Sequence, residues 1–145
     1  MKKYLSAVLI ITMFTFFFNS CKSTEVQQIE GNWTTSAIEI NKKELSVCPS
    51  TLIISKSNKN LYELNGNSGV NCFFASAKVK GTSFKLLNNM GSTKMLGDRE
   101  SMEFEKNFTQ ILIEANSIKT FSEDSKEYLI IQSSSGKKLT FAKEN

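Results

Sequence analysis

The sequence contains no histidine among its 145 residues. This absence excludes Ser–His and Cys–His catalytic pairs and any imidazole ligand for a metal. Proline occurs once and glycine seven times, so the chain is neither collagen-like nor of low complexity. Lysine and arginine never form a run longer than two. A chain without a basic stripe lacks the electrostatic footprint of a nucleic-acid-binding protein.

The length and the hydrophobic content predict one folded domain. Of the 145 residues, 40% are hydrophobic, which is enough for a single core but not for two separate ones. Eleven phenylalanines are present, four of them within the first 18 residues. We expect the others to fill the interior of the domain with side chains rather than leave a large cavity.

The N-terminal segment has the three parts of a secretory signal peptide. Lys2 and Lys3 form a basic start, residues 4–18 are almost wholly apolar, and the small residue Ser20 precedes Cys21. This order is typical of secretory signals. The apolar run of 15 residues is shorter than the about 20 residues of a membrane-spanning helix. Residues 1–20 are therefore predicted to be a signal peptide that is removed.

The end of this segment resembles the signal of a bacterial lipoprotein, in which a cysteine is acylated and becomes the first residue of the mature chain. Cys21 takes that place, and of the residues before it Ser20 fits best. The resemblance implies a lipoprotein of the bacterial cell envelope, held at the outer membrane by acyl chains such as palmitate on Cys21. Each buried methylene contributes about 0.8 kcal/mol, so two or three chains bind durably. The alternative is a plain signal peptide followed by an incidental cysteine.

Residues 21–30 are predicted to form a lipid-anchored tether ahead of a domain at residues 31–145. The nine residues after Cys21 reach at most about 30 Å, so the domain stays near its membrane. Within the domain, apolar residues that alternate between turn signals predict short antiparallel strands. They are expected at residues 33–40, 51–57, 60–66, 72–79, 83–87, 117–122, 127–134 and 137–143.

One segment, at about residues 99–115, has the period of a helix instead. Its apolar residues form a single stripe. They are Phe104, Phe108, Ile111, Leu112 and Ala115. Asp98 or Ser101 is expected to cap its N-terminus. An antiparallel sheet curled around or against this helix, in the α+β class, is the predicted architecture.

Six short motifs follow one another along the domain. They are Gly31-x-Trp33, residues 66–71 (GNSGVN), Thr93-Lys94-Met95, Glu105-x-x-Phe108-x-x-x-Leu112, residues 129–131 (LII) and residues 136–141 (GKKLTF). As an ordered set they resemble the META domains, the HslJ-like envelope proteins. The resemblance implies a conical, partly open β-barrel interrupted by a helix, an envelope location and a loose association with heat or antibiotic stress. It implies no catalytic residue, and the architectural relatives of the family include lipoprotein pilots of secretion systems.

The cysteines depart from the family pattern. Similar proteins usually carry cysteine at the position of Val70, and often a second at that of Gly97; this chain has neither. Antiparallel strands that flank a turn near Lys59 should pair residues whose numbers sum to about 118–120. The numbers of Cys48 and Cys72 sum to 120, so we predict instead a disulfide between these two residues. A compartment outside the cytoplasm permits the oxidation. The alternative is two unpaired thiols, since a zinc site lacks ligands and a catalytic thiolate lacks a base.

Several polar residues are candidates for chemistry or for structure. Ser68 lies in GNSG, one residue short of the G-x-S-x-G nucleophile elbow, and is expected to be a turn residue. Glu100, Glu103 and Glu105 lie near the start of the helix, where the helix dipole favours solvated carboxylates. We expect these four residues to be structural rather than catalytic.

A polar set that matches the family motifs forms the candidate binding surface. Its members are Asn71, Thr93, Lys94 and Met95. The alternative is that Thr93 and Met95 lock the loop before the helix and bind nothing.

The sequence favours a protein without catalytic activity. The first hypothesis is an interaction or stress-tolerance module that binds another envelope protein. The alternatives are a barrel whose apolar cavity binds an acyl chain or a small hydrophobic ligand, and a pilot-like lipoprotein for a secretion component of the envelope. An enzyme is the least favoured class. The expected partners are the membrane and an envelope protein, with no nucleic acid, metal or cofactor, and the protein is expected to be a monomer.

Overall fold

The computed structural model describes residues 28–144. The predicted signal peptide, Cys21 and most of the tether lie outside these residues. The described chain forms ten strands and one helix. In chain order they are β1 (Gly31–Ile40), β2 (Lys43–Leu45), β3 (Thr51–Asn58), β4 (Leu61–Asn67), β5 (Cys72–Lys80), β6 (Ser83–Leu86), β7 (Gly91–Ser92), α1 (Arg99–Glu114), β8 (Ala115–Glu123), β9 (Lys126–Ser133) and β10 (Lys138–Lys143).

Eight of the strands close into an antiparallel barrel. Around the ring they follow the order β1, β3, β4, β5, β6, β8, β9 and β10, and β10 pairs with β1 to complete it. β2 pairs with the second half of β1, and β7 pairs with β5. The expected α+β class and curled antiparallel sheet are confirmed. The ring is closed, and its weakest seam joins β6 to β8 through the single register pair Ser83 and Ser117.

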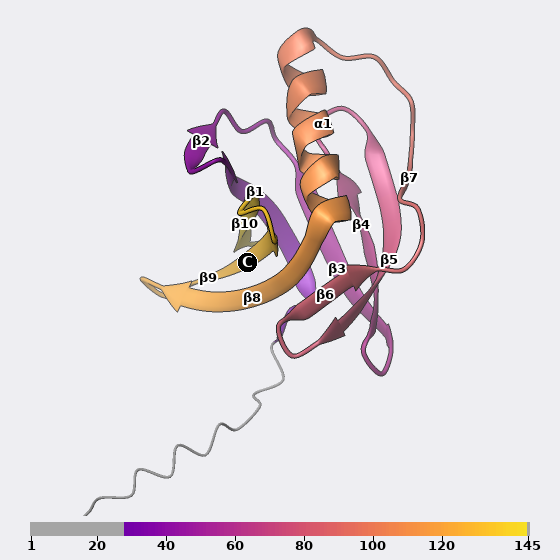
Figure 1. Ribbon diagram of the computed structural model, residues 1–145, viewed down its shortest axis with the longest axis vertical. Coiled ribbons are helices and arrows are strands. Elements are labelled where there is room, and N and C mark those ends of the chain that lie inside the picture. The colour runs from indigo at the N-terminus through magenta and orange to yellow at the C-terminus, as the bar shows by residue number, and fades with distance from the viewer. Residues whose placement is uncertain (1–27, 145) are drawn as a thin grey trace, which may run out of the picture.

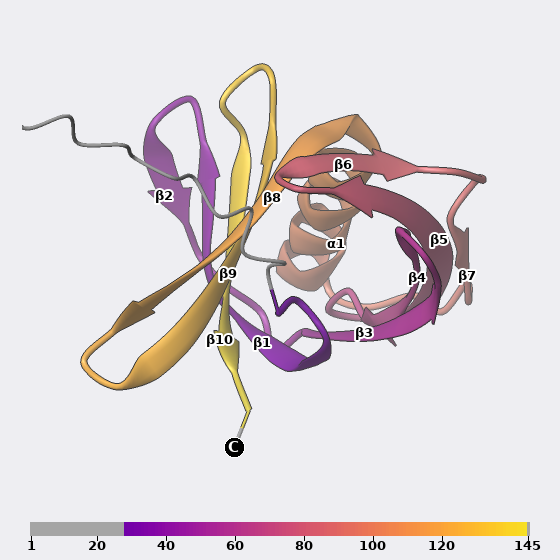
Figure 2. The same cartoon turned by 90° about the horizontal axis from the view of Figure 1, so that it is seen from below.

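The helix lies along the concave side of the barrel wall. In Figures 1 and 2, α1 runs beside the curved strands β3 to β6 and passes at its lower end directly into β8. The helix begins where the sequence predicts, because Asp98 accepts hydrogen bonds from Ser101 N at 2.9 Å and Ser101 Oγ at 2.6 Å. These bonds from the Ser101 side chain and backbone hold the pKa of Asp98 below its ordinary value. The helix ends at Ala115, whose backbone is already extended.

The turns between strands follow from residues that tolerate positive φ. β8 and β9 are joined by Asp124 and Ser125, with φ of 48° and 63°, the type I′ geometry that matches the twist of a hairpin. The β3–β4 turn contains Asn60 at φ 62°, as the turn signal near Lys59 predicts. Each strand expected from the sequence is present. The strands missed are β2 and β7, whose three and two residues are too few for alternation to be seen.

The interior is filled by aromatic and branched side chains. Along β5, Phe73, Ala75, Ala77 and Val79 are buried and the intervening residues face outward, as the alternation predicts. The helix buries Phe108 completely, with its ring centroid 5.6 Å from that of Phe73 on β5 and 6.1 Å from that of Phe141 on β10. The helix stripe therefore ties opposite walls of the barrel together.

The described helix does not have the dimensions of a membrane span. Within residues 28–144, no helix is both long enough and apolar enough to cross a bilayer.

Candidate functional site

A carboxylate on the helix holds the loop between β4 and β5. Glu105 Oε2 accepts hydrogen bonds from the backbone N–H groups of Asn71 at 2.7 Å and Val70 at 3.2 Å, and from Ser68 Oγ at 3.0 Å. Glu105 Oε1 accepts one from Asn71 Nδ2 at 2.8 Å. We call residues 68–71 with Glu105 the loop clamp. The expectation of a solvated carboxylate is therefore wrong for Glu105, whereas Glu100 and Glu103 are exposed.

Local sequence explains why the loop presents its N–H groups inward. The Asn67 side chain accepts a hydrogen bond from Gly69 N at 2.7 Å, and Ser68 N donates to Asn71 O at 2.9 Å, which closes a four-residue turn. Gly69 has φ +118°, and a Cβ there would lie 3.0 Å from the Phe104 ring. Adjacent N–H groups that converge on one point form an anion-binding nest. In this protein the nest is occupied by its own Glu105, so it is not open to a ligand anion.

The hydrogen bonds of the clamp outweigh the cost of burying its charge. Burial by itself raises the pKa of Glu105. The bonds from the Asn71 side chain and backbone, from Ser68 and from Val70 lower it, and the net pKa is below the ordinary value. The clamp thus contains an ionised carboxylate at neutral pH. Its arrangement is typical of a structural lock, because the one hydroxyl of the clamp, Ser68 Oγ, lies 3.0 Å from both Glu105 Oε2 and Asn71 O, and Ser68 is only 1% exposed.

The Asn71 side chain extends the clamp to the loop before the helix. Its Oδ1 accepts hydrogen bonds from Met95 N at 2.7 Å and Thr93 Oγ1 at 2.8 Å, and its Nδ2 donates to Met95 O at 3.2 Å. Asn71 is only 2% exposed, so the structure places this member of the candidate binding surface inside the protein. The alternative that Thr93 and Met95 lock this loop matches the bonds observed.

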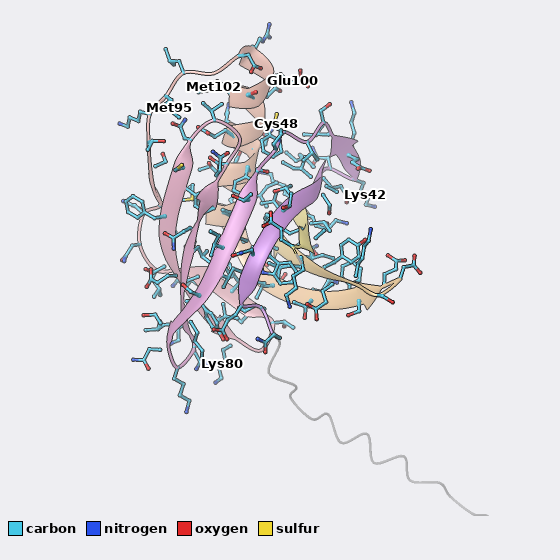
Figure 3. All side chains as sticks on the ribbon, turned by 180° about the vertical axis from the view of Figure 1, so that it is seen from behind. Lys42, Cys48, Lys80, Met95, Glu100 and Met102 are labelled. Atoms are coloured by element: carbon cyan, nitrogen blue, oxygen red, sulfur yellow. The ribbon has the colours of Figure 1, made fainter. Side chains whose placement is uncertain are left out.

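The remaining members of the candidate surface face solvent. Lys94 is exposed, Met95 is 55% exposed and Leu96 is 94% exposed. We call residues 94–96 the apolar tip. Sequence reasoning missed Leu96 because a single leucine in a polar loop has no periodic pattern. Figure 3 shows Met95 at the same end of the molecule as Glu100 and Cys48, with Lys80 at the opposite end.

The predicted disulfide is not formed, and both cysteines of the described chain are free thiols. The β3–β4 register is as predicted, with Thr51 opposite Asn67. The chain then reverses, and Cys72 pairs with Asn67 on β4. β4 therefore lies between Cys72 and β3, the strand that begins three residues after Cys48. Two strand spacings, about 9.6 Å, exceed the about 7 Å that a disulfide spans. Cys48 instead lies with its Sγ 3.9 Å from Ser101 Oγ.

The cavity at the end of the barrel where α1 begins is small. It has a volume of about 190 Å³ and lies between the β1–β2 hairpin and the start of α1. It is lined by Ile38, Leu45, Ser46, Glu100, Glu103, Phe104 and Asn107. Pockets for small-molecule ligands usually measure about 300–1,000 Å³, so an acyl chain does not fit there. Across residues 28–144, no three histidine, cysteine or acidic side chains gather to hold a metal.

Comparisons with known proteins agree with this geometry. A solved NMR structure of a protein from Burkholderia xenovorans is similar, with a TM-score of 0.67 and 20% sequence identity, over 80% of this chain and 83% of that chain. At this identity the likeness concerns the fold alone. No curated protein gives a significant match. The family model of the META domain matches residues 25–145, and the chain therefore belongs to the META domain family.

Proposed function

We propose that the protein is a non-catalytic, lipid-anchored interaction module of the bacterial envelope, which uses the apolar tip to bind another envelope protein. The observation that carries this proposal is the contrast between the exposure of the tip and its rigid support. Leu96 is almost fully exposed, while both backbone polar groups of its neighbour Met95 are bonded to the buried Asn71 side chain.

A rigid apolar tip is well suited to binding a protein. Ordering a loop costs free energy on association, and a loop that is already ordered avoids this cost. Methionine adapts its shape to different apolar surfaces, and Lys94 beside it supplies charge. The family resemblance implies a loose association with heat or antibiotic stress, and binding through the tip would steady the partner protein under such stress.

The position of the tip supports a partner beyond the membrane surface. The chain enters the barrel through Gly31, which pairs with Ile54 in the middle of β3. The preceding residue, Glu30, accepts a hydrogen bond from Lys56 N, closer to the β3–β4 turn. In Figure 1 this entry lies at the end opposite the start of α1. If Cys21 is acylated, the tether holds that end of the barrel towards the outer membrane and the tip points away from it.

A photo-crosslinking amino acid tests the partner. Placed at Leu96 in the full chain and activated in living cells, it should yield an adduct of larger mass. Ile53, a 43% exposed residue on β3, is the matched control for an exposed apolar position elsewhere and should yield none. Equal adducts at both positions, or none at Leu96, would refute the proposal. The partner is identified from the excised adduct.

A second candidate, binding of an acyl chain or small hydrophobic ligand, is favoured by an open groove outside the barrel. The groove has a volume of about 770 Å³ and is lined by Leu86, Leu87, Asn88, Asn89, Met90 and Ile113. Ile113 is 59% exposed and Leu87 44% exposed, so an apolar ligand would cover both. Titration with a fluorescent fatty acid tests this candidate. Saturable binding that is lost in Ile113→Lys supports it, and no binding to the wild type rules it out.

A further inference from the structure

Strand β8 has one unpaired edge at its end. It pairs with β9 over its whole length, from Ala115 to Glu123. On its other side, the described chain provides only the register pair Ser117 with Ser83 and a hydrogen bond from Ile118 N to Thr82 O at 2.9 Å. Residues 119–123 have no strand beside them. In Figures 1 and 2, the β8–β9 ribbon extends away from the rest of the barrel.

The hairpin geometry determines which backbone groups are free. In a two-residue hairpin, Glu123 and Lys126 beside the turn form a hydrogen-bonded pair, and such pairs recur at every second residue. Glu123, Phe121 and Lys119 therefore direct their backbone N–H and C=O groups toward β9.

Thr120 and Ser122 direct their backbone N–H and C=O groups away from β9. They alternate in phase with Ile118, whose N–H donates outward to Thr82 O. Thr120 and Ser122 thus present two donors and two acceptors at the free edge.

The side chains of this edge are complementary to themselves. Lys119, Phe121 and Glu123 lie on one face, opposite the face of the buried Ile118. An antiparallel copy centred on Phe121 places Lys119 opposite Glu123 twice and Thr120 opposite Ser122 twice. Opposite charges across paired strands are favourable. Within the described residues, neither Lys119 nor Glu123 forms an ion pair.

We propose that two copies of this chain associate through residues 119–123 of β8, paired antiparallel about a two-fold axis at Phe121. A second copy is the occupant because a two-fold interface requires a self-complementary patch, and Lys-Thr-Phe-Ser-Glu is one. Phe121 is 38% exposed and stacks on Tyr128 with ring centroids 5.0 Å apart. At the axis the two Phe121 side chains meet and join the two stacks.

The free groups and the charges select one register. Centring the pair on Thr120 would place Ser122 opposite Ile118, whose N–H already donates to Thr82 O. Centring it on Ser122 would place Thr120 opposite Asp124, which lies in the turn with φ 48°. A slip by one residue would bring inward-directed groups to the edge. Only the pairing centred on Phe121 uses every free backbone group and matches the charges.

The proposed dimer departs from the monomer expected from the sequence. The edge contributes five residues per chain, fewer than the about 20–30 residues per side of a standard interface, so the dimer is weak in dilute solution. Anchoring both copies in one membrane would raise their effective concentration and favour pairing. The pairing itself does not depend on the apolar tip, which lies at a different end of the barrel.

Cysteine cross-linking in intact cells tests the register. The full chain with Cys48→Ser and Cys72→Ser provides the background. Phe121→Cys should form a disulfide-linked dimer, because residues opposite each other at a non-hydrogen-bonded position have Cα atoms about 4.5 Å apart, within disulfide range. Lys119→Cys is the matched control on the same face. Its two copies would lie about 13 Å apart along the strands and should not link.

Charge reversal provides an independent readout in the Phe121→Cys background. Lys119→Glu and Glu123→Lys should each lower the dimer yield by about threefold or more, because like charges then face each other. The double variant Lys119→Glu with Glu123→Lys should restore the yield. Thermal unfolding of each variant checks that the fold is kept. Four outcomes would each overturn the proposal. They are equal linking at residues 119 and 121, linking of Phe121→Cys to a different protein, no dimer at all, and a double variant whose dimer yield does not recover.

Discussion

At the scale of single residues, Glu105 is the polar side chain that accepts the most hydrogen bonds in the loop clamp, with four donors on residues 68–71. Glu105→Gln removes the charge that accepts from Ser68, Val70 and Asn71. Hydrogen bonds to charged groups contribute about 1.5–3 kcal/mol, so we expect the free energy of unfolding to fall by about that amount at pH 7. Urea titration measures it. Glu103→Gln, on an exposed part of the same helix, is the control and should change it by less than about 0.5 kcal/mol.

The same residue makes part of the stability depend on pH. The pKa of Glu105 is lowered in the folded state from its ordinary 4.5. Its contribution is therefore complete above the unfolded pKa and is lost as pH falls through the lower folded pKa. The difference in unfolding free energy between the wild type and Glu105→Gln should shrink when measured at pH 3 rather than pH 7. A difference that stays constant would show that the clamp does not depend on the ionised carboxylate.

Val70 and Gly97 occupy the two positions at which the family resemblance leads us to expect cysteine, and the structure places these positions next to each other. A Cβ built at Gly97 would lie 3.5 Å from the Val70 Cβ, within the 3.5–4.5 Å of a disulfide. In a Cys48→Ser, Cys72→Ser background, Val70→Cys with Gly97→Cys should form a bridge that stabilises the fold by about 3 kcal/mol. Intact mass after alkylation, with and without reduction, measures the bridge. Thiols that remain free in the oxidised protein would contradict the prediction.

The sequence predicted single-residue roles less well than elements. The arithmetic for Cys48 and Cys72 placed the β3–β4 register correctly, but it could not show that the chain reverses again after Asn67. The role of Asn71 was also hidden. The Asn71 side chain bonds both the N–H and the C=O of Met95, as a neighbouring backbone would. In the sequence such an asparagine looks the same as one at the surface, because only the fold decides which groups it contacts.

At the scale of elements, the helix is the part that sequence periodicity predicts best. Its observed bounds, Arg99–Glu114, differ from the prediction by one residue, because both its cap and its apolar stripe are local signals. The strands were predicted for the same reason. Their order around the barrel, the closure by β10 and β1, and the unpaired end of β8 depend on contacts between distant segments, which no local pattern contains.

Phe108 tests how strongly the helix supports the barrel. Its side chain is fully buried and its ring lies near those of Phe73, Phe104 and Phe141. Phe108→Ala should lower the free energy of unfolding by about 3–5 kcal/mol through lost burial and a cavity. Ile113→Ala, at a 59% exposed position of the same helix, should cost less than about 1 kcal/mol. Similar losses in the two variants would mean that the stripe is not what holds the helix in place.

At the scale of the whole molecule, the two ends of the barrel have different surroundings if the protein is anchored through Cys21. Lys80 lies at one end and Met95, next to Leu96, at the other (Figure 3). The nine residues of β5 span about 30 Å, so the two ends differ measurably in distance from the membrane. The chain enters on the side of the β3–β4 turn, where Lys56 N donates to the Glu30 carboxylate, and this is the end at which Lys80 lies.

Fluorescence quenching by lipids measures this orientation. The full chain is produced in cells with the Cys48→Ser and Cys72→Ser background, labelled at Lys80→Cys or Leu96→Cys, and placed in vesicles that carry a nitroxide quencher in the headgroup region. We expect stronger quenching at residue 80, because the tether of at most about 30 Å keeps that end near the membrane. Cys21→Ala should abolish quenching at both positions, since without acyl chains the domain leaves the vesicles. Stronger quenching at residue 96 would reverse the orientation and make the apolar tip a membrane contact, whereas quenching that persists in Cys21→Ala would remove the lipid anchor from the proposed function.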